Sequence, residues 1–268
     1  MTATIAIAVN VFRESVRDKV LYNLVLFAIL MIGASYLIGQ LTAGQDVKII
    51  KDLGLAATTV FGLFIAIFIG IGLVSKEVER RSVYSLLAKP IHRYQIVLGK
   101  YAGLVLTLVV NVLVMAAALY AVLAYMRWDI DPALERVWDA PALDPRLMTA
   151  VLLILFELML VTAIALFFST FSTPLLSAAF TFAITIAGHF STDLRNFQDV
   201  VQSRAAQTLA RGVYWVLPNL APFDVKAQVV HGQTVSAGYI GLVAAYDAVY
   251  ISSLLVIATL VFSRRDFK

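Results

Sequence analysis

Long stretches with almost no charged side chains constrain this sequence more than any other feature. Five stretches carry at most one Asp, Glu, Lys or Arg each: residues 20–45, 53–75, 101–126, 147–192 and 227–263. The two exceptions are Glu157 in the fourth stretch and Asp247 in the fifth. An α-helix needs about 20 apolar residues to cross the hydrocarbon core of a bilayer. The sequence therefore predicts an all-α protein that crosses a membrane several times.

The fourth stretch is 46 residues long, which suits two membrane-spanning helices better than one. The sequence "STFSTP", residues 169–174, divides it, because Ser172 or Thr173 can cap a new helix and Pro174 suits its first turn. We therefore expect a single transmembrane domain, residues 1–268, in which six spans cover the following approximate ranges: 20–40, 53–75, 100–126, 147–169, 174–190 and 238–262.

The distribution of charge predicts the orientation. Six spans place both termini on one side, and that side holds twelve basic and five acidic residues, half of the basic ones within residues 76–100. The opposite loops hold nine basic and ten acidic residues. The positive-inside rule then predicts a multi-pass protein of the plasma (inner) membrane with cytoplasmic termini. The sequence pI of 9.3 reflects this distribution, and we expect no nucleic-acid partner.

Two further segments are predicted to lie at the membrane surface. Near the N-terminus, apolar residues recur every three to four positions: Ile5, Val9, Phe12, Val16 and Val20. This spacing predicts an interfacial helix in the cytoplasmic headgroup layer. On the opposite side, residues 191–237 form the longest loop, in which an amphipathic stripe precedes "YWVLPNLAPF" at 214–223. We expect one outer interfacial or re-entrant segment there, before the last span.

A charged island, "KEVERRSVYSLLAKPIHRYQIVLGK" at residues 76–100, separates the second and third spans. Residues 77–87 can form a short helix with Val83, Leu86 and Leu87 on one face. Pro90 ends that helix and suits the start of another that runs into the third span. An ordinary cytoplasmic loop explains the positive charge. A soluble protein that docks on the island also explains the apolar face and the proline.

This island resembles the signature between spans two and three of ABC-2-type ABC transporter permeases. The pattern has acidic residues, a Leu-Leu pair, Pro-Ile-Ser-Arg and a later Gly-Lys, although Arg81 and Ser82 stand where Gly-Thr is usual. The matching residues are Glu77, Glu79, Leu86, Leu87, Pro90, Ile91, Arg93, Gly99 and Lys100.

The resemblance implies a permease that pairs with a second permease and docks a separate ABC ATPase through a cytoplasmic coupling helix. ATP and Mg would bind on that ATPase, with no cofactor or catalytic site in this chain. Gly99-Lys100 is the only Gly-Lys pair, and Tyr101 follows it where a P-loop needs Ser or Thr. The residues implied to contact the ATPase are Glu77, Glu79, Arg80, Arg81, Val83, Leu86, Leu87, Pro90 and Arg93.

Polar side chains within the predicted spans form a second set of candidates. Glu157 and Asp247 each cost roughly 2.5–3.5 kcal/mol in a bilayer unless they find a partner, a proton or water. We interpret both as inter-helix hydrogen-bonding groups rather than as a substrate path, with Tyr246 and Tyr250 as donors to Asp247. Asn111 is expected to bond between helices. The three histidines show no metal-ligand spacing, and each is interpreted as a single satisfied side chain.

The favoured function is the permease subunit of an ATP-driven exporter with an unidentified substrate. One alternative is a proton-coupled secondary carrier that uses Glu157. Another is an ATP-driven subunit that transmits motion to an outer partner without passing a substrate. An intramembrane enzyme has less support, because the sequence offers no Ser/His pair or metal cluster. Dependence on an ATPase separates the first and third functions from the other two.

Overall fold

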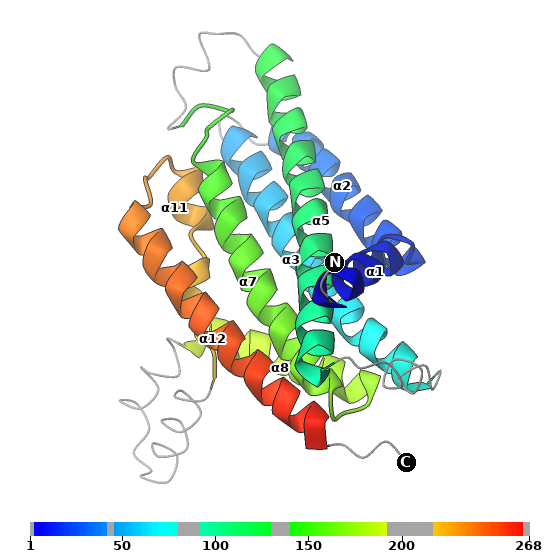
Figure 1. Cartoon of the computed structure of the whole chain (residues 1–268). Coiled ribbons are helices and arrows are strands. Elements are labelled where there is room, and N and C mark those ends of the chain that lie inside the picture. The colour runs from blue at the N-terminus through cyan, green and yellow to red at the C-terminus, as the bar shows by residue number, and fades with distance from the viewer. Residues whose placement is uncertain (1–2, 42–45, 80–91, 130–139, 192–216, 265–268) are drawn as a thin grey trace, which may run out of the picture.

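Helices form the whole of the regular structure in the part of the chain that the computed structural model describes. That part consists of five ranges: residues 3–41, 46–79, 92–129, 140–191 and 217–264 (Figure 1). The elements are α1 (Ala3–Val16), α2 (Lys19–Gln40), α3 (Asp46–Glu79), α5 (Arg93–Asp129), α7 (Leu147–Ser169), α8 (Pro174–His189), the 3-10 turn η1 (Ala221–Phe223), α11 (Lys226–Val230) and α12 (Ala237–Arg264). The predicted all-α class is confirmed for these residues.

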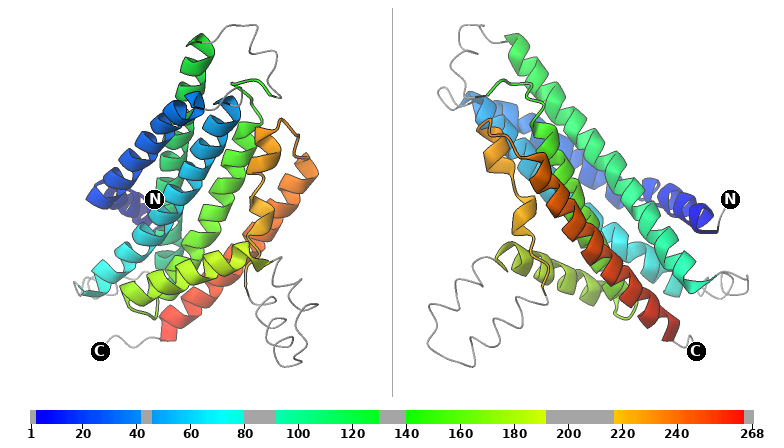
Figure 2. Two further views of the ribbon diagram at one scale, coloured as in Figure 1. Left: turned by 180° about the vertical axis from the view of Figure 1, so that it is seen from behind. Right: turned by 60° about the vertical axis from the view of Figure 1, so that its left-hand side comes forward.

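Five of the helices lie side by side in a tilted bundle (Figures 1 and 2). Each contains a segment that is long and apolar enough to cross a membrane: Lys19–Gln40, Asp46–Gly72, Arg93–Trp128, Leu147–Ser169 and Ala237–Ser263. α3 and α5 are longer than the spans predicted at 53–75 and 100–126, because their apolar segments begin at Asp46 and Arg93. The chain is thus a multi-pass membrane protein.

The helices differ in how much of their surface is covered. α7 lies at the centre, in contact with α3, α5, α8 and α12, and its buried residues lie on every side of the helix. A helix that is apolar all round is typical of such a surrounded position. α2 and α12 lie at the edge of the bundle, and large apolar side chains such as Phe27 and Val249 are exposed there.

The helix at the position of the fifth predicted span, 174–190, has nearly the predicted bounds but is short for a membrane crossing. α8 begins at Pro174, as predicted, and Thr173 takes the capping position without a side-chain cap hydrogen bond. Its 16 residues extend about 24 Å, which is less than the roughly 30 Å of a hydrocarbon core. It also lies obliquely to α7 (Figure 2). The crossing of the membrane by this segment therefore stays a prediction.

Residues 217–231 pack against the end of α8 and against the long helices of the bundle. The Leu220 N–H donates to the Gly188 carbonyl at 3.0 Å. From there the chain passes through η1 and α11 along α3 and α7, and it buries Phe223, Val225, Val229 and Val230. Arg146 then contacts the Gly232 carbonyl near the start of α7. This part of the predicted outer loop therefore packs against the bundle with one side, while Asp224, Gln228 and His231 are exposed.

α1 crosses α5 on the outside of the bundle (Figure 2). It lies on Gly99 and Gly103, where added Cβ atoms would come within 2.8 Å of Ile7 and 2.6 Å of the Ala8 carbonyl oxygen. Small residues four positions apart let two helix backbones approach this closely. Of the predicted apolar stripe, Ile5 is 50% exposed, while Val9, Phe12 and Val16 are half-buried. The helix is confirmed, and its place at the membrane interface stays a prediction.

Candidate functional site

The predicted coupling residues lie at and between the ends of two long helices. Glu77 and Glu79 belong to the last turn of α3, which continues without a break to Glu79. The expected short helix at 77–87 therefore does not begin as a separate element at Glu77. α5 begins at Arg93 and continues into the bundle as one helix, as predicted. The remaining coupling residues lie outside the described ranges: Arg80, Arg81, Val83, Leu86, Leu87 and Pro90.

Arg93 connects the start of α5 to the end of α12. Its Nη1 donates to the carbonyl oxygens of Phe262, at 3.1 Å, and Ser263, at 2.5 Å. The last carbonyls of a helix have no partner within the helix and carry the negative end of its dipole. The guanidinium of Arg93 donates to two of these carbonyls and places a positive charge at the negative end of the α12 dipole. The arginine of the signature thus holds two spans together inside this chain, a role that the sequence pattern did not indicate.

The Gly-Lys pair that ends the signature is a packing site. Gly99 lies under α1, as described above, and Lys100 is only 6% exposed. A lysine at the end of a predicted span commonly reaches towards the headgroups, whereas the side chain of Lys100 is buried in the protein. The first three turns of α5 are therefore in contact with α12 through Arg93 and with α1 through Gly99 and Gly103.

A second candidate site lies deeper in the bundle, where α7 meets the end of α8. Glu157 is 1% exposed, and its Oε1 lies 3.2 Å from Nε2 of His189. The other ring nitrogen, Nδ1, lies 3.0 Å from the Thr185 carbonyl oxygen. Because a carbonyl can only accept, Nδ1 carries a hydrogen. The contact between Nε2 and Oε1 then requires one shared proton, held either by the imidazole or by the carboxyl group.

This pair gives Glu157 the inter-helix hydrogen bond predicted for it, with a partner that had been interpreted as an isolated histidine. Sharing one proton makes the pair neutral overall, which lowers the cost of a carboxyl group in a bilayer. Oε2 of Glu157 is buried and has no hydrogen-bond partner among the described residues. One polar atom at this site is therefore left for a further donor.

Lys226 brings a positive charge close to the same layer. Its Nζ lies 3.4 Å from Asp224 Oδ1 and 3.5 Å from the Thr59 hydroxyl of α3. The sequence places Lys226 in the predicted outer loop. Contact of α11 with α3 and α7 instead brings this side chain next to α3.

The other two intramembrane candidates are placed differently from the predictions. Asp247 is 3% exposed, and neither Tyr246 nor Tyr250 donates to its Oδ1, which has no hydrogen-bond partner among the described residues. The Tyr246 hydroxyl accepts the N–H of Asn219 at 2.8 Å. Nδ2 of Asn111 donates to the Thr107 carbonyl oxygen of its own helix at 2.6 Å, and an inter-helix bond by this side chain stays a prediction.

Lys51 is a buried charge that the sequence did not single out. It is fully buried near the start of α3, and its Nζ donates to the Pro141 carbonyl oxygen at 2.8 Å. Tyr120 donates to the nearby Asp144 carbonyl oxygen at 2.9 Å. These bonds fasten the segment before α7 to α3 and α5. Within the described ranges, His, Asp and Glu side chains form no group of three or more that could hold a metal ion.

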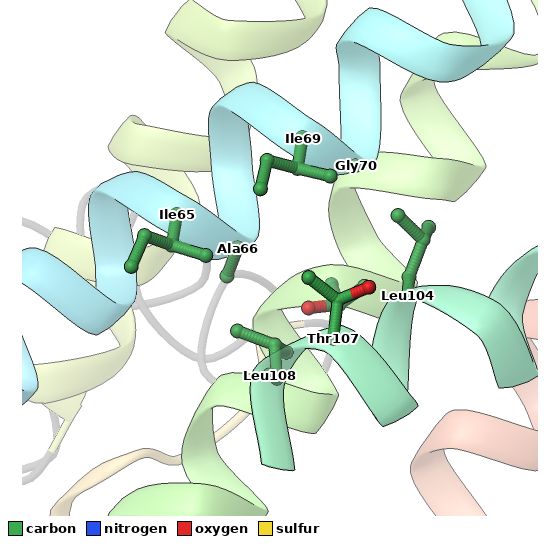
Figure 3. A pocket seen from close by; sticks show the side chains of 8 residues that line it. Ile65, Ala66, Ile69, Gly70, Leu104, Thr107 and Leu108 are labelled. Atoms are coloured by element: carbon green, nitrogen blue, oxygen red, sulfur yellow. The ribbon is translucent and has the colours of Figure 1, made fainter. Parts of the chain in front are cut away.

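The space between α3, α5 and α7 is almost completely filled. Figure 3 shows side chains of α3 and α5 that face each other across a small gap, among them Ile65, Ile69, Leu104 and Thr107. Thr162 of α7 also lines this gap, which has no room for a water molecule. At this level the three helices leave no aqueous path between them.

Comparison with known proteins identifies the family. The model of the ABC-2 family of transporter proteins matches residues 5–267, nearly the whole chain. No curated protein matches the sequence. The match includes both candidate sites, from α1 on α5 to the contact between Glu157 and His189. The chain therefore belongs to the ABC-2 family of transporter proteins, and it is a membrane permease subunit of an ABC transporter.

Proposed function

We propose that this chain is one membrane-spanning half of an exporter, and that it couples ATP hydrolysis by a separate ABC ATPase to movement of a substrate. ATP and Mg bind on that ATPase. Two permeases, identical or different, pair in the plasma (inner) membrane with their termini in the cytoplasm. The observation that carries the proposal is the contact between Arg93, in the signature, and the end of α12.

The contacts around the signature support a mechanical route into the bundle. Residues 80–91 connect α3 directly to α5, so a displacement of this segment moves the ends of both helices. Arg93 passes the displacement to α12, and Gly99 and Gly103 pass it to α1. Packed helices joined by such contacts can carry coupling between distant sites. An ATPase that docks on this segment would thus act on four helices at once.

The filled centre of the chain supports a substrate path between two permeases rather than through one. The gap in Figure 3 does not admit water. The edge helices α2 and α12 and the outer face of α8 carry exposed apolar side chains, such as Leu175 at 80%. Such faces suit contact with lipid or with a second permease.

The test is co-purification of the ATPase. We expect the double substitution Leu86→Asp and Leu87→Asp to release the ATPase from a permease that still folds, because both changes fall on the predicted docking face outside the membrane. Arg13→Asp, an exposed change in α1 on the same predicted side, is the control and should keep the ATPase. Retention of the ATPase by the double variant would overturn the coupling role.

Orientation is tested separately with single cysteines, since the natural chain has none. Cysteine at position 82 should react with an impermeant maleimide from the cytoplasm, and cysteine at position 133 from outside. Labelling of both positions from the same side would contradict the proposed topology.

The shared proton between Glu157 and His189 favours a second candidate, the proton-coupled carrier. Glu157→Gln, assayed with the ATPase bound, separates the two. The exporter should keep ATP-driven transport, whereas a carrier should lose transport driven by a pH gradient in vesicles without ATP. If neither gradient nor ATP moves any substrate while ATP hydrolysis persists, the remaining alternative of a motion-transmitting subunit is supported.

A further inference from the structure

An open groove lies on the outside of the bundle, between the start of α5 and the last third of α12. Its volume is about 310 Å³. Its lining is mainly apolar: Tyr94 and Leu98 come from α5, and Leu255, Val256 and Leu260 come from α12. Leu98 is 40% exposed and Val256 is 59% exposed, so the groove opens outwards and not into the centre of the bundle.

The dimensions of the groove match one leaflet of a bilayer. Along α12 it extends from Ser252 to Leu260, which is about 12 Å of helix. Half of a hydrocarbon core measures about 15 Å. Thr259 also lines the groove, and its hydroxyl donates to the Leu255 carbonyl oxygen of its own helix at 2.8 Å. The groove therefore suits an apolar ligand that is long and narrow.

One end of the groove is positively charged. Arg93 precedes the lining residue Tyr94 and reaches the last turn of α12 with Nη1 alone. A guanidinium has five N–H donors, and the structure gives the others of Arg93 no bond within the described residues. The ring of His92 stacks on Tyr94, with centroids 5.5 Å apart. Tyrosine is enriched where the hydrocarbon core meets the headgroups.

An apolar groove with a cation and an aromatic ring at its outer end has the polarity of a phospholipid. We propose that one anionic phospholipid of the leaflet on this side of the membrane binds here, with an acyl chain in the groove and its phosphate on Arg93. Arginine suits this position because its planar donors match phosphate oxygens. The proposal goes beyond the transport function, since it depends neither on the cargo nor on the ATPase.

The experiment counts bound lipid on the purified full chain. The protein is delipidated in detergent, incubated with phosphatidylglycerol or phosphatidylcholine, and analysed by native mass spectrometry. We expect one retained phosphatidylglycerol per chain, bound about fivefold more tightly than phosphatidylcholine, as one nearby basic side chain provides. Val256→Trp should fill the groove and abolish this binding. Val249→Trp, an equally apolar exposed site on the same helix outside the groove, should leave it intact.

Headgroup recognition needs its own variants. Arg93→Gln should remove the roughly fivefold preference for phosphatidylglycerol while the acyl chain still binds. Arg93→Lys keeps the charge and should retain most of the preference, which separates loss of charge from loss of the α12 cap. Equal lipid binding by Val256→Trp and Val249→Trp would overturn the proposal. A wild-type chain without bound lipid, whose dimer is lost only in Val256→Trp, would overturn it by identifying a protein interface.

Discussion

α7 and α8 are consecutive apolar helices with very different places in the molecule. α7 has 23 residues, crosses the bundle and is mostly buried, with exposed side chains such as Met148 and Leu152 only near its start. α8 has 16 residues, lies obliquely and exposes large apolar side chains, such as Leu175 and Phe180. Its buried face instead carries small and polar residues: Ser177, Thr181, Thr185 and Gly188. In lipid, close approach of small residues holds helices together, so a helix can expose its apolar bulk.

The largest expected effect on stability tests the difference in burial between α7 and α8. Leu158 of α7 is fully buried against Gly62 of α3. Leu158→Ala should leave a cavity and lower the free energy of unfolding by about 3 kcal/mol. Leu175→Ala in α8 should change it by less than about 0.5 kcal/mol, because that side chain is exposed. Unfolding in mixed micelles measures both, and similar losses would contradict the difference in burial.

The next effect concerns the contact between the helices. Glu157→Ala should lower the free energy of unfolding by about 2 kcal/mol, since it removes a hydrogen bond in which one partner is buried. His189→Gln keeps a donor for the carboxyl group and should lose less than half as much. Equal losses from the two variants would show that the ring of His189, and not its bond to Glu157, holds α8 in place.

A smaller effect is expected where α8 meets residues 217–231. An added Cβ at Gly188 would lie 2.7 Å from the Pro218 carbonyl oxygen, a backbone atom that cannot move alone. Gly188→Ala should therefore cost about 1.5 kcal/mol through overpacking. Gly241→Ala in α12, where nothing lies within 4 Å, should be neutral or slightly stabilising. A stability change no larger than in this control would place residues 217–231 away from α8.

The smallest effect tests the polar face of α8. The Thr181 hydroxyl donates to the Ser177 carbonyl of its own helix at 2.7 Å, so Thr181→Val should cost less than about 0.5 kcal/mol. Tyr246→Phe should cost about 1 kcal/mol, because the Asn219 N–H loses a partner on another element. The reverse order in thermal unfolding would indicate that Thr181 bonds between helices.

Much of the fold was predictable because a helix that crosses a bilayer needs about 20 apolar residues, which can be read directly from the sequence. The bounds of α7 agree with the prediction at both ends, and Pro174 marks the start of α8. Glu157 was recognised as a group in need of a partner. Its partner was not found, because His189 is 32 residues away and meets it only through the oblique course of α8. The position of Lys226 next to α3 was not predicted either, because polar residues and prolines made its segment resemble an outer loop.

The sequence alone determined the all-α membrane class, the apolar crossings and the family, because these depend on length, hydropathy and a local signature. Only the tertiary structure decided that Arg93 caps α12, that Gly99 and Gly103 receive α1, and that residues 217–231 pack against α3 and α7. Each of these joins elements far apart in the chain. Hydropathy indicates whether a segment prefers lipid or water. Which helix surfaces pack against each other depends on the shapes of all the helices together.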